Sequence, residues 1–157
     1  KVLISLGINK VFSEIANSEF RLRLKGRLGE AGIQMVNLIH PNTYIAPSVK
    51  LGQGNFIKVG AIIDSNTCIG NCCIIDNNVI IAHDNIVEDS CHLAPGVTLG
   101  SGITIGKKTI IGIGASISTK VRIGKDVIVG VGSSVVQDVP DNSIVEGVPG
   151  KIIGKRK

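Results

Sequence analysis

The sequence predicts a mainly β protein, folded as a parallel β-helix that is preceded by a small partial β-α-β unit. Every sixth residue from Ile39 to Val135 is aliphatic, and the fifth residue of each hexad, from Thr43 to Val139, is neither large nor charged. The chain has no Trp, one Tyr and three Phe, which suits a narrow core of β-branched side chains. A short fixed period marks a solenoid, whose units bury their apolar sides only by stacking on their neighbours.

Three hexads, each with one short strand and one corner, are expected to make one triangular coil. Glycine recurs at the second hexad position, for example at Gly52, Gly100 and Gly124, where a missing side chain is expected to let the backbone turn a tight corner. Coils stacked at the ordinary strand spacing of roughly 4.8 Å would make a prism about 27 Å tall. The β-helix is predicted to span residues 39–140, followed by a closing segment and basic tail over 141–157.

The first 38 residues do not follow the hexad rule. They are expected to form a strand over Val2–Leu6, a helix from Val11 to about Ala31 and a second strand over Ile33–Leu38, with Gly32 ending the helix. Such a β-α-β unit is typical of the latter half of a small nucleotide-binding domain. The glycine-rich phosphate loop of a complete domain is not in this sequence.

Composition and charge argue against several classes of function. The net charge of +5 comes mostly from the N-terminal part and the tail, without the interleaved aromatic residues that nucleic-acid binding favours. No apolar run approaches the roughly 20 residues that span a bilayer, and no signal peptide is seen. The four cysteines lack a metal-ligand spacing, so no metal is predicted. Cys73 and Cys91 are expected to be small buried residues, which implies a reducing, cytoplasmic setting.

His83 is the first candidate for chemistry. An imidazole titrates close to neutrality, and the carboxylate of the following residue, Asp84, would raise its basicity as a general base. The alternative is an exposed histidine beside an exposed aspartate. His40, at the mouth of the first coil, is expected to have a boundary role.

The segment Ala82-His83-Asp84, followed by Cys91-His92-Leu93-Ala94-Pro95-Gly96, resembles the hexapeptide-repeat sugar acetyltransferases related to sialic acid O-acetyltransferase and to the N-acetyltransferase of the bacillosamine pathway. The resemblance covers nearly the whole chain, including Ile39-His40-Pro41 and the closing Gly147-Val148-Pro149-Gly150-Lys151. It implies a left-handed parallel β-helix. It also implies transfer of an acetyl group from acetyl-CoA to an amine or hydroxyl of a sugar, which is expected to be nucleotide-linked.

The resemblance implies a role for each candidate residue. His83 would be the base that deprotonates the acceptor, Asp84 would increase its basicity, and His92 would contact the acetyl group and thioester of acetyl-CoA. The backbone at Gly112-Ile113 and Gly130-Val131 would hold the pantetheine arm, at a site between subunits of a homotrimer. Asp76 lies where relatives carry a polar residue behind the site. Gly7 would lie in the sugar-nucleotide loop, within a nucleotide-sugar-binding unit over residues 1–38.

Several alternatives remain open at this point. No cysteine or serine is placed as an obvious covalent nucleophile, so direct transfer in a ternary complex is expected. The acceptor could instead be of the serine, maltose or antibiotic type, and N-transfer and O-transfer are not separated. The histidine spacings do not fit a γ-type carbonic anhydrase. A non-catalytic structural or ice-binding solenoid would need a regular exposed Thr or Val ladder, which is absent from the sequence.

Overall fold

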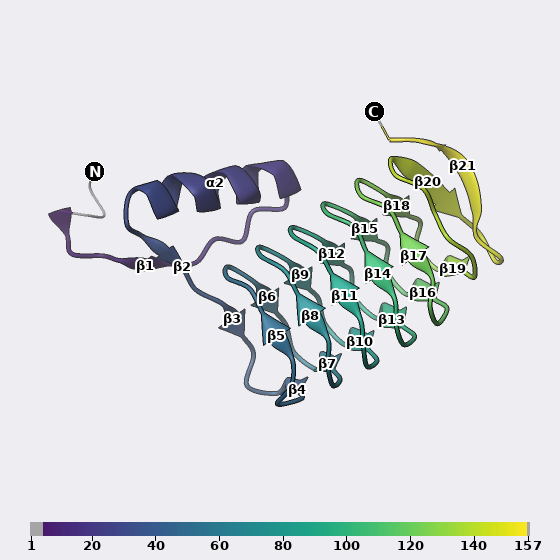
Figure 1. The fold of residues 1–157 in the computed structure, drawn as a ribbon, viewed down its shortest axis with the longest axis horizontal. Helices are drawn as coiled ribbons and strands as arrows, with labels where there is room; N and C mark the ends of the chain where they lie inside the picture. The colour runs from purple at the N-terminus through teal and green to yellow at the C-terminus, as the bar shows by residue number, and fades with distance from the viewer. Residues whose placement is uncertain (1–4, 157) are drawn as a thin grey trace.

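The computed structural model describes residues 5–156 and has the predicted architecture, a left-handed parallel β-helix with a small α/β unit at its N-terminal end (Figure 1). The β-helix is a three-faced prism, and each face is a parallel sheet with one strand from each coil. Strands one coil apart are in register at an interval of eighteen residues, as in the pairs Ile62↔Ile80 and Ile80↔Thr98.

Face I is the eight-stranded sheet, with β3 (Leu38–Ile39), β6 (Phe56–Ile57), β9 (Ile74–Ile75), β12 (His92–Leu93), β15 (Ile110–Ile111), β18 (Ile128–Val129), β20 (Ser143–Glu146) and β21 (Lys151–Lys155). Face II has β4 (Tyr44–Ile45), β7 (Ile62–Ile63), β10 (Ile80–Ile81), β13 (Thr98–Leu99), β16 (Ser116–Ile117) and β19 (Ser134–Val135). Face III has β5 (Lys50–Leu51), β8 (Cys68–Ile69), β11 (Ile86–Val87), β14 (Thr104–Ile105) and β17 (Arg122–Ile123). All the face strands except β21 run parallel; β21 pairs antiparallel with β20 and closes face I.

Four-residue corners join the strands and form three vertical edges of the prism. We call them edge I/II, for example residues 112–115, edge II/III, for example residues 82–85, and edge III/I, for example residues 88–91. The fourth hexad residue of many corners has the left-handed backbone, including Asn66 (φ 57°), Asp84 (φ 60°) and Lys120 (φ 64°). The chain turns at this position.

The second-position glycines have a different role from the predicted one. None of them has a positive φ, so they are not the residues that need left-handed backbone at the corner. A Cβ on Gly112 would lie 2.7 Å from Val129 O, and one on Gly106 would lie 2.5 Å from Lys125 N of the next coil. Glycine is needed at these positions because successive coils approach closely, which is a constraint of stacking and not of turning.

The core confirms both inward hexad positions. The first-position residues from Ile57 to Val135 are buried, as are fifth-position residues such as Ala61, Cys73 and Val97. Polar residues at the fifth position are bonded to neighbouring coils: Asn85 Nδ2 donates to Gly100 O at 2.9 Å, and its Oδ1 accepts from Ile103 N. Among the described residues, no buried side-chain nitrogen or oxygen lacks a partner.

The N-terminal unit is a β-α-β arrangement with shorter elements than predicted. Its strands are β1 (Lys10–Val11) and β2 (Gln34–Met35), which pair in parallel, and its helix is α2 (Ser18–Glu30). The helix starts at Ser18 and not at Val11, because the Asn17 side chain caps it by accepting from Phe20 N at 2.9 Å. Most of the predicted strand Val2–Leu6 lies outside the described residues, and its last two residues are not in a strand.

A buried arginine attaches α2 to edge III/I. Arg21 is 1% exposed; its Nε donates to Cys72 O at 2.9 Å and its Nη2 donates to Ser90 O at 3.0 Å. Its Nη1 donates to Ile15 O and Ala16 O, each at 2.8 Å, just before the helix. Since α2 buries no other side chain fully, this guanidinium is the main anchor between helix and β-helix.

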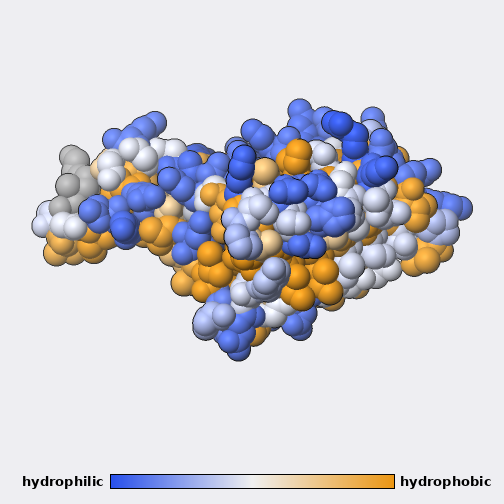
Figure 2. Space-filling model, turned by 60° about the horizontal axis from the view of Figure 1, so that its bottom comes forward, coloured by the Kyte–Doolittle hydropathy of each residue, from blue (hydrophilic) through white to orange (hydrophobic). Residues whose placement is uncertain are grey.

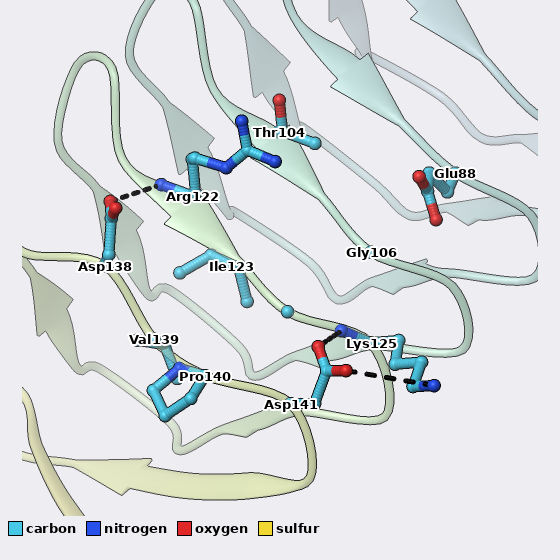
Figure 3. A pocket seen from close by; sticks show the side chains of 11 residues that line it. Glu88, Thr104, Gly106, Arg122, Ile123, Lys125, Asp138, Val139, Pro140 and Asp141 are labelled. Atoms are coloured by element: carbon cyan, nitrogen blue, oxygen red, sulfur yellow. Dashed lines mark hydrogen bonds and ion pairs between the residues drawn. The ribbon is translucent and has the colours of Figure 1, made fainter.

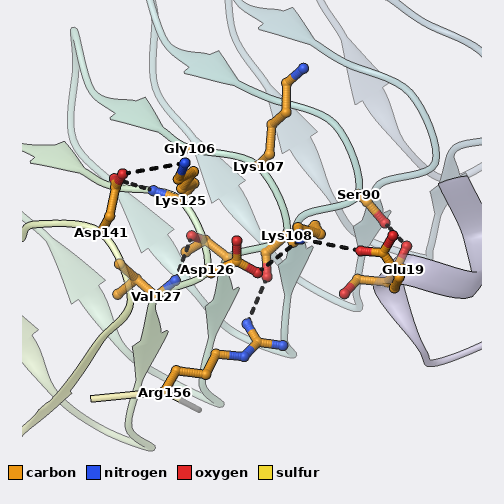
Figure 4. A network of polar contacts seen from close by, with 12 residues as sticks. Glu19, Ser90, Gly106, Lys107, Lys108, Lys125, Asp126, Val127, Asp141 and Arg156 are labelled. Atoms are coloured by element: carbon orange, nitrogen blue, oxygen red, sulfur yellow. Dashed lines mark hydrogen bonds and ion pairs between the residues drawn. The ribbon is translucent and has the colours of Figure 1, made fainter. Parts of the chain in front are cut away.

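A second polar network lies on the same edge and includes the C-terminal segment (Figure 4). Lys108 Nζ lies 3.2 Å from Glu19 Oε2 of α2 and 3.3 Å from Asp126 Oδ1. Arg156, which follows β21, donates through Nη1 to Lys108 O at 2.9 Å. Edge III/I is therefore covered by both ends of the described chain.

Face II is free of such a cover. Tyr44, Ile62 and Ile80 lie one above another on it and are 58%, 42% and 43% exposed. Figure 2 turns the lower side of Figure 1 forward and shows hydrophobic residues gathered there. In the described part of the chain, no helix has the length and apolar character needed to cross a membrane.

Candidate active site

His83 and Asp84 lie on edge II/III and contact each other. His83 Nδ1 is 2.7 Å from Asp84 Oδ2, and both side chains are about half exposed. Because Asp84 has the left-handed backbone, its carboxylate reaches back to the ring of the preceding residue. Asn66, one coil earlier, donates through Nδ2 to Asp84 Oδ1 at 3.1 Å.

The electrostatics of this pair favour a charged carboxylate. The hydrogen bond from His83, and after it the one from Asn66, lowers the pKa of Asp84 below its ordinary value. Asp84 is then ionised near neutral pH and accepts a hydrogen bond from a protonated Nδ1. The tautomer with Nδ1–H leaves the lone pair on Nε2 facing outward, as a general base requires.

A serine that the sequence analysis missed lies at the other ring nitrogen. Ser101 Oγ is 3.0 Å from His83 Nε2. The two residues occupy the same hexad position on consecutive coils, so the coil length of eighteen residues was the signal that could have found Ser101. The sequence showed no serine placed as an obvious covalent nucleophile, because Ser101 reaches the candidate base only through the stacking of coils.

These side chains line an open groove of about 470 Å³, together with Gly102, Thr119 and Lys120. The backbone of the groove is held by bonds between coils: Gly102 N donates to His83 O at 3.1 Å and Lys120 N donates to Ser101 O at 2.8 Å. The site thus combines an oriented imidazole, a hydroxyl and a cation on a rigid edge.

His92 lies on face I, at the start of β12, and not beside His83. Its Nε2 is 3.5 Å from Asp76 Oδ2, and Asp76 Oδ1 is 3.4 Å from Lys58 Nζ, which also lies 3.3 Å from Glu14 Oε1. Burial lowers the pKa of His92, and this outweighs the opposing effect of Asp76. His92 is therefore held mainly neutral. Sequence reasoning noted Asp76 and missed Lys58 and Glu14, which have no distinctive spacing.

Ile113 and Val131 lie one coil apart on edge I/II, the edge that also carries Asp76. They are 54% and 74% exposed. Within the described residues, no partner is found for the backbone N–H of either, whereas Ile113 O accepts from Gly132 N at 2.8 Å. Two unpartnered N–H groups on one edge can donate hydrogen bonds to an extended ligand.

The other predicted residues have these positions. Gly112 N and Gly130 N donate to Val129 O and Val145 O, each at 2.8 Å, so their N–H groups serve the coils. Gly7 precedes β1, is exposed and has φ 70°, with nothing within 4 Å of a Cβ built on it.

Metal ligation has no candidate in the described residues. No group of three His, Cys, Asp or Glu side chains there could hold an ion. His40 Nδ1 accepts from Asn42 N at 3.1 Å, a local contact at the first corner. Cys72 is buried at edge III/I, has the left-handed backbone and accepts from Arg21 Nε through its carbonyl oxygen.

A second groove, of about 500 Å³, lies on face III near the C-terminal end (Figure 3). Asp138 Oδ1 accepts from Arg122 N at 2.8 Å, Asp141 Oδ1 accepts from Lys125 N at 2.9 Å, and the guanidinium of Arg122 extends toward Thr104. No histidine, cysteine or serine lines this groove. The groove at His83 is the better candidate for acyl transfer.

Comparison with curated proteins gives partial matches. No family model matches the chain. It is 30% identical over 103 residues to GDP-perosamine N-acetyltransferase of Escherichia coli O157:H7, an alignment that covers 66% of this chain and 47% of the relative. It is 37% identical over 109 residues to serine acetyltransferase of Mycobacterium tuberculosis, covering 63% of this chain and 48% of the relative. The chain thus spans about half the length of these curated relatives.

Comparison with solved structures covers nearly the whole chain. PerB from Caulobacter crescentus, in complex with CoA and GDP-perosamine, has a TM-score of 0.96 at 36% identity, over 98% of this chain and 74% of that one. WeeI from Acinetobacter baumannii AYE has a TM-score of 0.87 at 32% identity, over 92% of this chain and 70% of that one. The acetyltransferase domain of PglB from Neisseria gonorrhoeae FA1090 has a TM-score of 0.91 at 25% identity, over 97% and 76%. The chain therefore belongs to the hexapeptide-repeat sugar acetyltransferase family.

Proposed function

We propose that this chain transfers an acetyl group from acetyl-CoA to an amine of a nucleotide-linked amino sugar, with His83 as general base. The observation that carries the proposal is the imidazole whose Nδ1 is held by Asp84 and whose Nε2 opens to a groove. The match to PerB, in complex with CoA and GDP-perosamine, supports the class of acceptor and the acetyl donor.

The chemistry follows from the state of the His83 ring. Nε2 accepts a proton from the acceptor amine as the nitrogen attacks the thioester carbonyl, and the proton then goes to the departing thiolate of CoA. Asp84 stabilises the imidazolium that forms in between. Direct transfer in a ternary complex needs only this one base. The same base would serve a hydroxyl acceptor, so the comparisons and not the geometry favour N-transfer.

The donor is proposed to bind along edge I/II. The unpartnered N–H groups of Ile113 and Val131 suit the amide carbonyls of a pantetheine arm, and the Gly112 and Gly130 positions allow the close stacking of coils that holds this backbone. His92, held neutral beside this edge, would contact the thioester end, and Asp76 would orient its ring.

The two groups of residues imply a homotrimer with active sites between subunits. The base lies on edge II/III and the proposed donor site on edge I/II, and both edges border face II. In a ring of three copies in which edge II/III of one meets edge I/II of the next, His83 faces the edge of the partner subunit that carries the proposed donor site. Such a ring also buries Tyr44, Ile62 and Ile80, which are exposed in the single chain.

We propose residues 1–38, with Gly7, as part of the nucleotide-sugar site, residues 39–140 as the acyltransferase domain and 141–157 as its closing segment. A cytoplasmic location fits the four free cysteines, three of which are buried.

A thiol-release assay tests the function. Purified protein is given acetyl-CoA and a panel of acceptors: GDP- and UDP-linked amino sugars, sialic acid and L-serine. We expect CoA release with an amino-sugar nucleotide, and a loss of about a hundredfold or more in the His83→Ala variant. His40→Ala is the matched control and should retain activity. An unchanged rate in His83→Ala, or a preference for L-serine, would contradict the proposal.

A further inference from the structure

Three side chains on edge II/III form a line that the proposed transfer reaction does not need. Asp84 Oδ2 lies 2.7 Å from His83 Nδ1, and Ser101 Oγ lies 3.0 Å from His83 Nε2. An acid, an imidazole and a hydroxyl connected in this order are the arrangement of Ser-His-Asp hydrolases, which occurs on unrelated folds. Direct transfer requires the acid and the imidazole alone.

The protons on these groups are arranged for nucleophilic attack. The ionised Asp84 carboxylate has no proton, so it accepts from Nδ1–H, and Nε2 is left with a lone pair. In the contact between Ser101 and His83, the hydroxyl is then the donor and the Nε2 lone pair is the acceptor. This is the activation that a serine nucleophile requires. The hydroxyl occupies the place at which the nucleophile of an acceptor would meet the base.

The surroundings of Ser101 can also stabilise an oxyanion. Its carbonyl is fixed by Lys120 N at 2.8 Å, and no partner is found in the described residues for its own backbone N–H. Lys120 and Thr119 line the same groove and add a cation and a second hydroxyl. An N–H that is free in a rigid corner, next to a positive charge, suits the developing charge of a tetrahedral intermediate.

We propose that Asp84, His83 and Ser101 act as a catalytic triad that hydrolyses acetyl-CoA when no acceptor is bound. Ser101 Oγ attacks the thioester carbonyl and gives its proton to His83 Nε2; the C–S bond breaks, and the thiolate takes that proton to leave as CoA. Water, deprotonated by His83, then attacks the acetyl-serine ester; the bond between the acyl carbon and Ser101 Oγ breaks, acetate leaves, and His83 Nε2 returns the proton to Ser101 Oγ. A bound acceptor displaces the Ser101 hydroxyl from Nε2 and receives the acetyl group directly. This inference rests on the proposed function for its acetyl donor.

The test uses the full chain with acetyl-CoA and no acceptor. CoA release is followed with a thiol reagent, and an acid-quenched sample is examined by peptide mass spectrometry for an acetyl ester. We expect slow release by the wild type, an acetyl group on Ser101, and release reduced about tenfold or more in Ser101→Ala. Acceptor-dependent transfer should stay within about threefold in this variant, because His83 and Asp84 remain.

Ser65→Ala is the matched control. Ser65 occupies the same position of edge II/III, one coil before His83, and within residues 5–156 no hydrogen bond joins its side chain to the ring, so its loss should leave hydrolysis unchanged. Two results would overturn the triad and leave the proposed function standing. One is equal hydrolysis of acetyl-CoA by wild type and Ser101→Ala. The other is a wild type that transfers the acetyl group to an acceptor but does not hydrolyse acetyl-CoA.

A second substrate tests for the opposite case, in which the triad is right and the proposed transfer function is wrong. p-Nitrophenyl acetate is an activated ester that needs no CoA site. If wild type hydrolyses it and Ser101→Ala does not, while no acceptor is acetylated from acetyl-CoA, then the triad stands and the proposed transfer function fails.

Discussion

The attachment of α2 to the β-helix should depend on one side chain, Arg21. Replacing Arg21 with Leu removes four hydrogen bonds to backbone carbonyls and leaves the oxygens of Cys72 and Ser90 without this donor. The helix buries no other residue fully, so no apolar contact replaces the loss. We expect α2 to detach locally while the coils remain folded, because each coil is held by its neighbours.

The magnitude follows from the two Arg21 hydrogen bonds that cross from the helix to the coils. A hydrogen bond from a charged donor contributes about 1.5–3 kcal/mol, so the Nε and Nη2 bonds together contribute about 3–6 kcal/mol before desolvation is counted. Burying the guanidinium costs part of this, which the leucine variant recovers. A net loss of about 3 kcal/mol shifts the equilibrium between attached and detached helix more than a hundredfold, at about 1.4 kcal/mol per factor of ten.

Hydrogen exchange read by mass spectrometry measures this equilibrium. Peptides from α2 should exchange about a hundredfold faster in Arg21→Leu, and peptides from the central coils should not change. Arg23→Leu on the same helix is the control; it removes an exposed cation–π contact 5.3 Å from the Phe20 ring and should cost less than about 1 kcal/mol. Equal exchange in the two variants, or coils that open together with α2, would refute the reasoning.

Three further predictions concern the coils and their titrating groups. Gly106→Ala would place a Cβ 2.5 Å from Lys125 N and should lower the free energy of unfolding, measured by calorimetry, by about 1–3 kcal/mol. Gly114→Asn, at φ 65° with open space around the Cβ, should lower it by less than about 1 kcal/mol. Equal losses in the two variants would contradict the stacking argument. Burial raises the pKa of Cys72 to about 11, so iodoacetamide should label Cys68 first; comparable labelling of both, by peptide mass spectrometry, would count against this burial. Burial lowers the pKa of His92 in the folded state, so the unfolded chain binds a proton at this residue first as the pH falls. The free energy of unfolding, measured in urea, should therefore decrease below about pH 6.5, and by more in wild type than in His92→Gln. Parallel curves for the two proteins would exclude this role.

Part of the candidate site could be predicted from neighbouring residues in the sequence. His83 and Asp84 are adjacent, so their pairing could be read from the sequence, and the left-handed corner at Asp84 supports it. Ser101 could have been found only by applying the coil length to the search for a nucleophile. The role of the second-position glycines was misread, because close approach of the next coil is not visible in one hexad.

The sequence by itself determined the β-helix, its core and the candidate base, because the period of six places the same two positions inward in every coil. Only the tertiary structure decided what holds α2 against the coils, since Arg21 finds its acceptors 51 and 69 residues away. It also decided that the candidate residues divide between two edges of face II and that Ser101 meets His83. These contacts join residues on different coils or faces. They depend on the geometry of the corners and on the stacking of coils, and the sequence of a single hexad does not determine either.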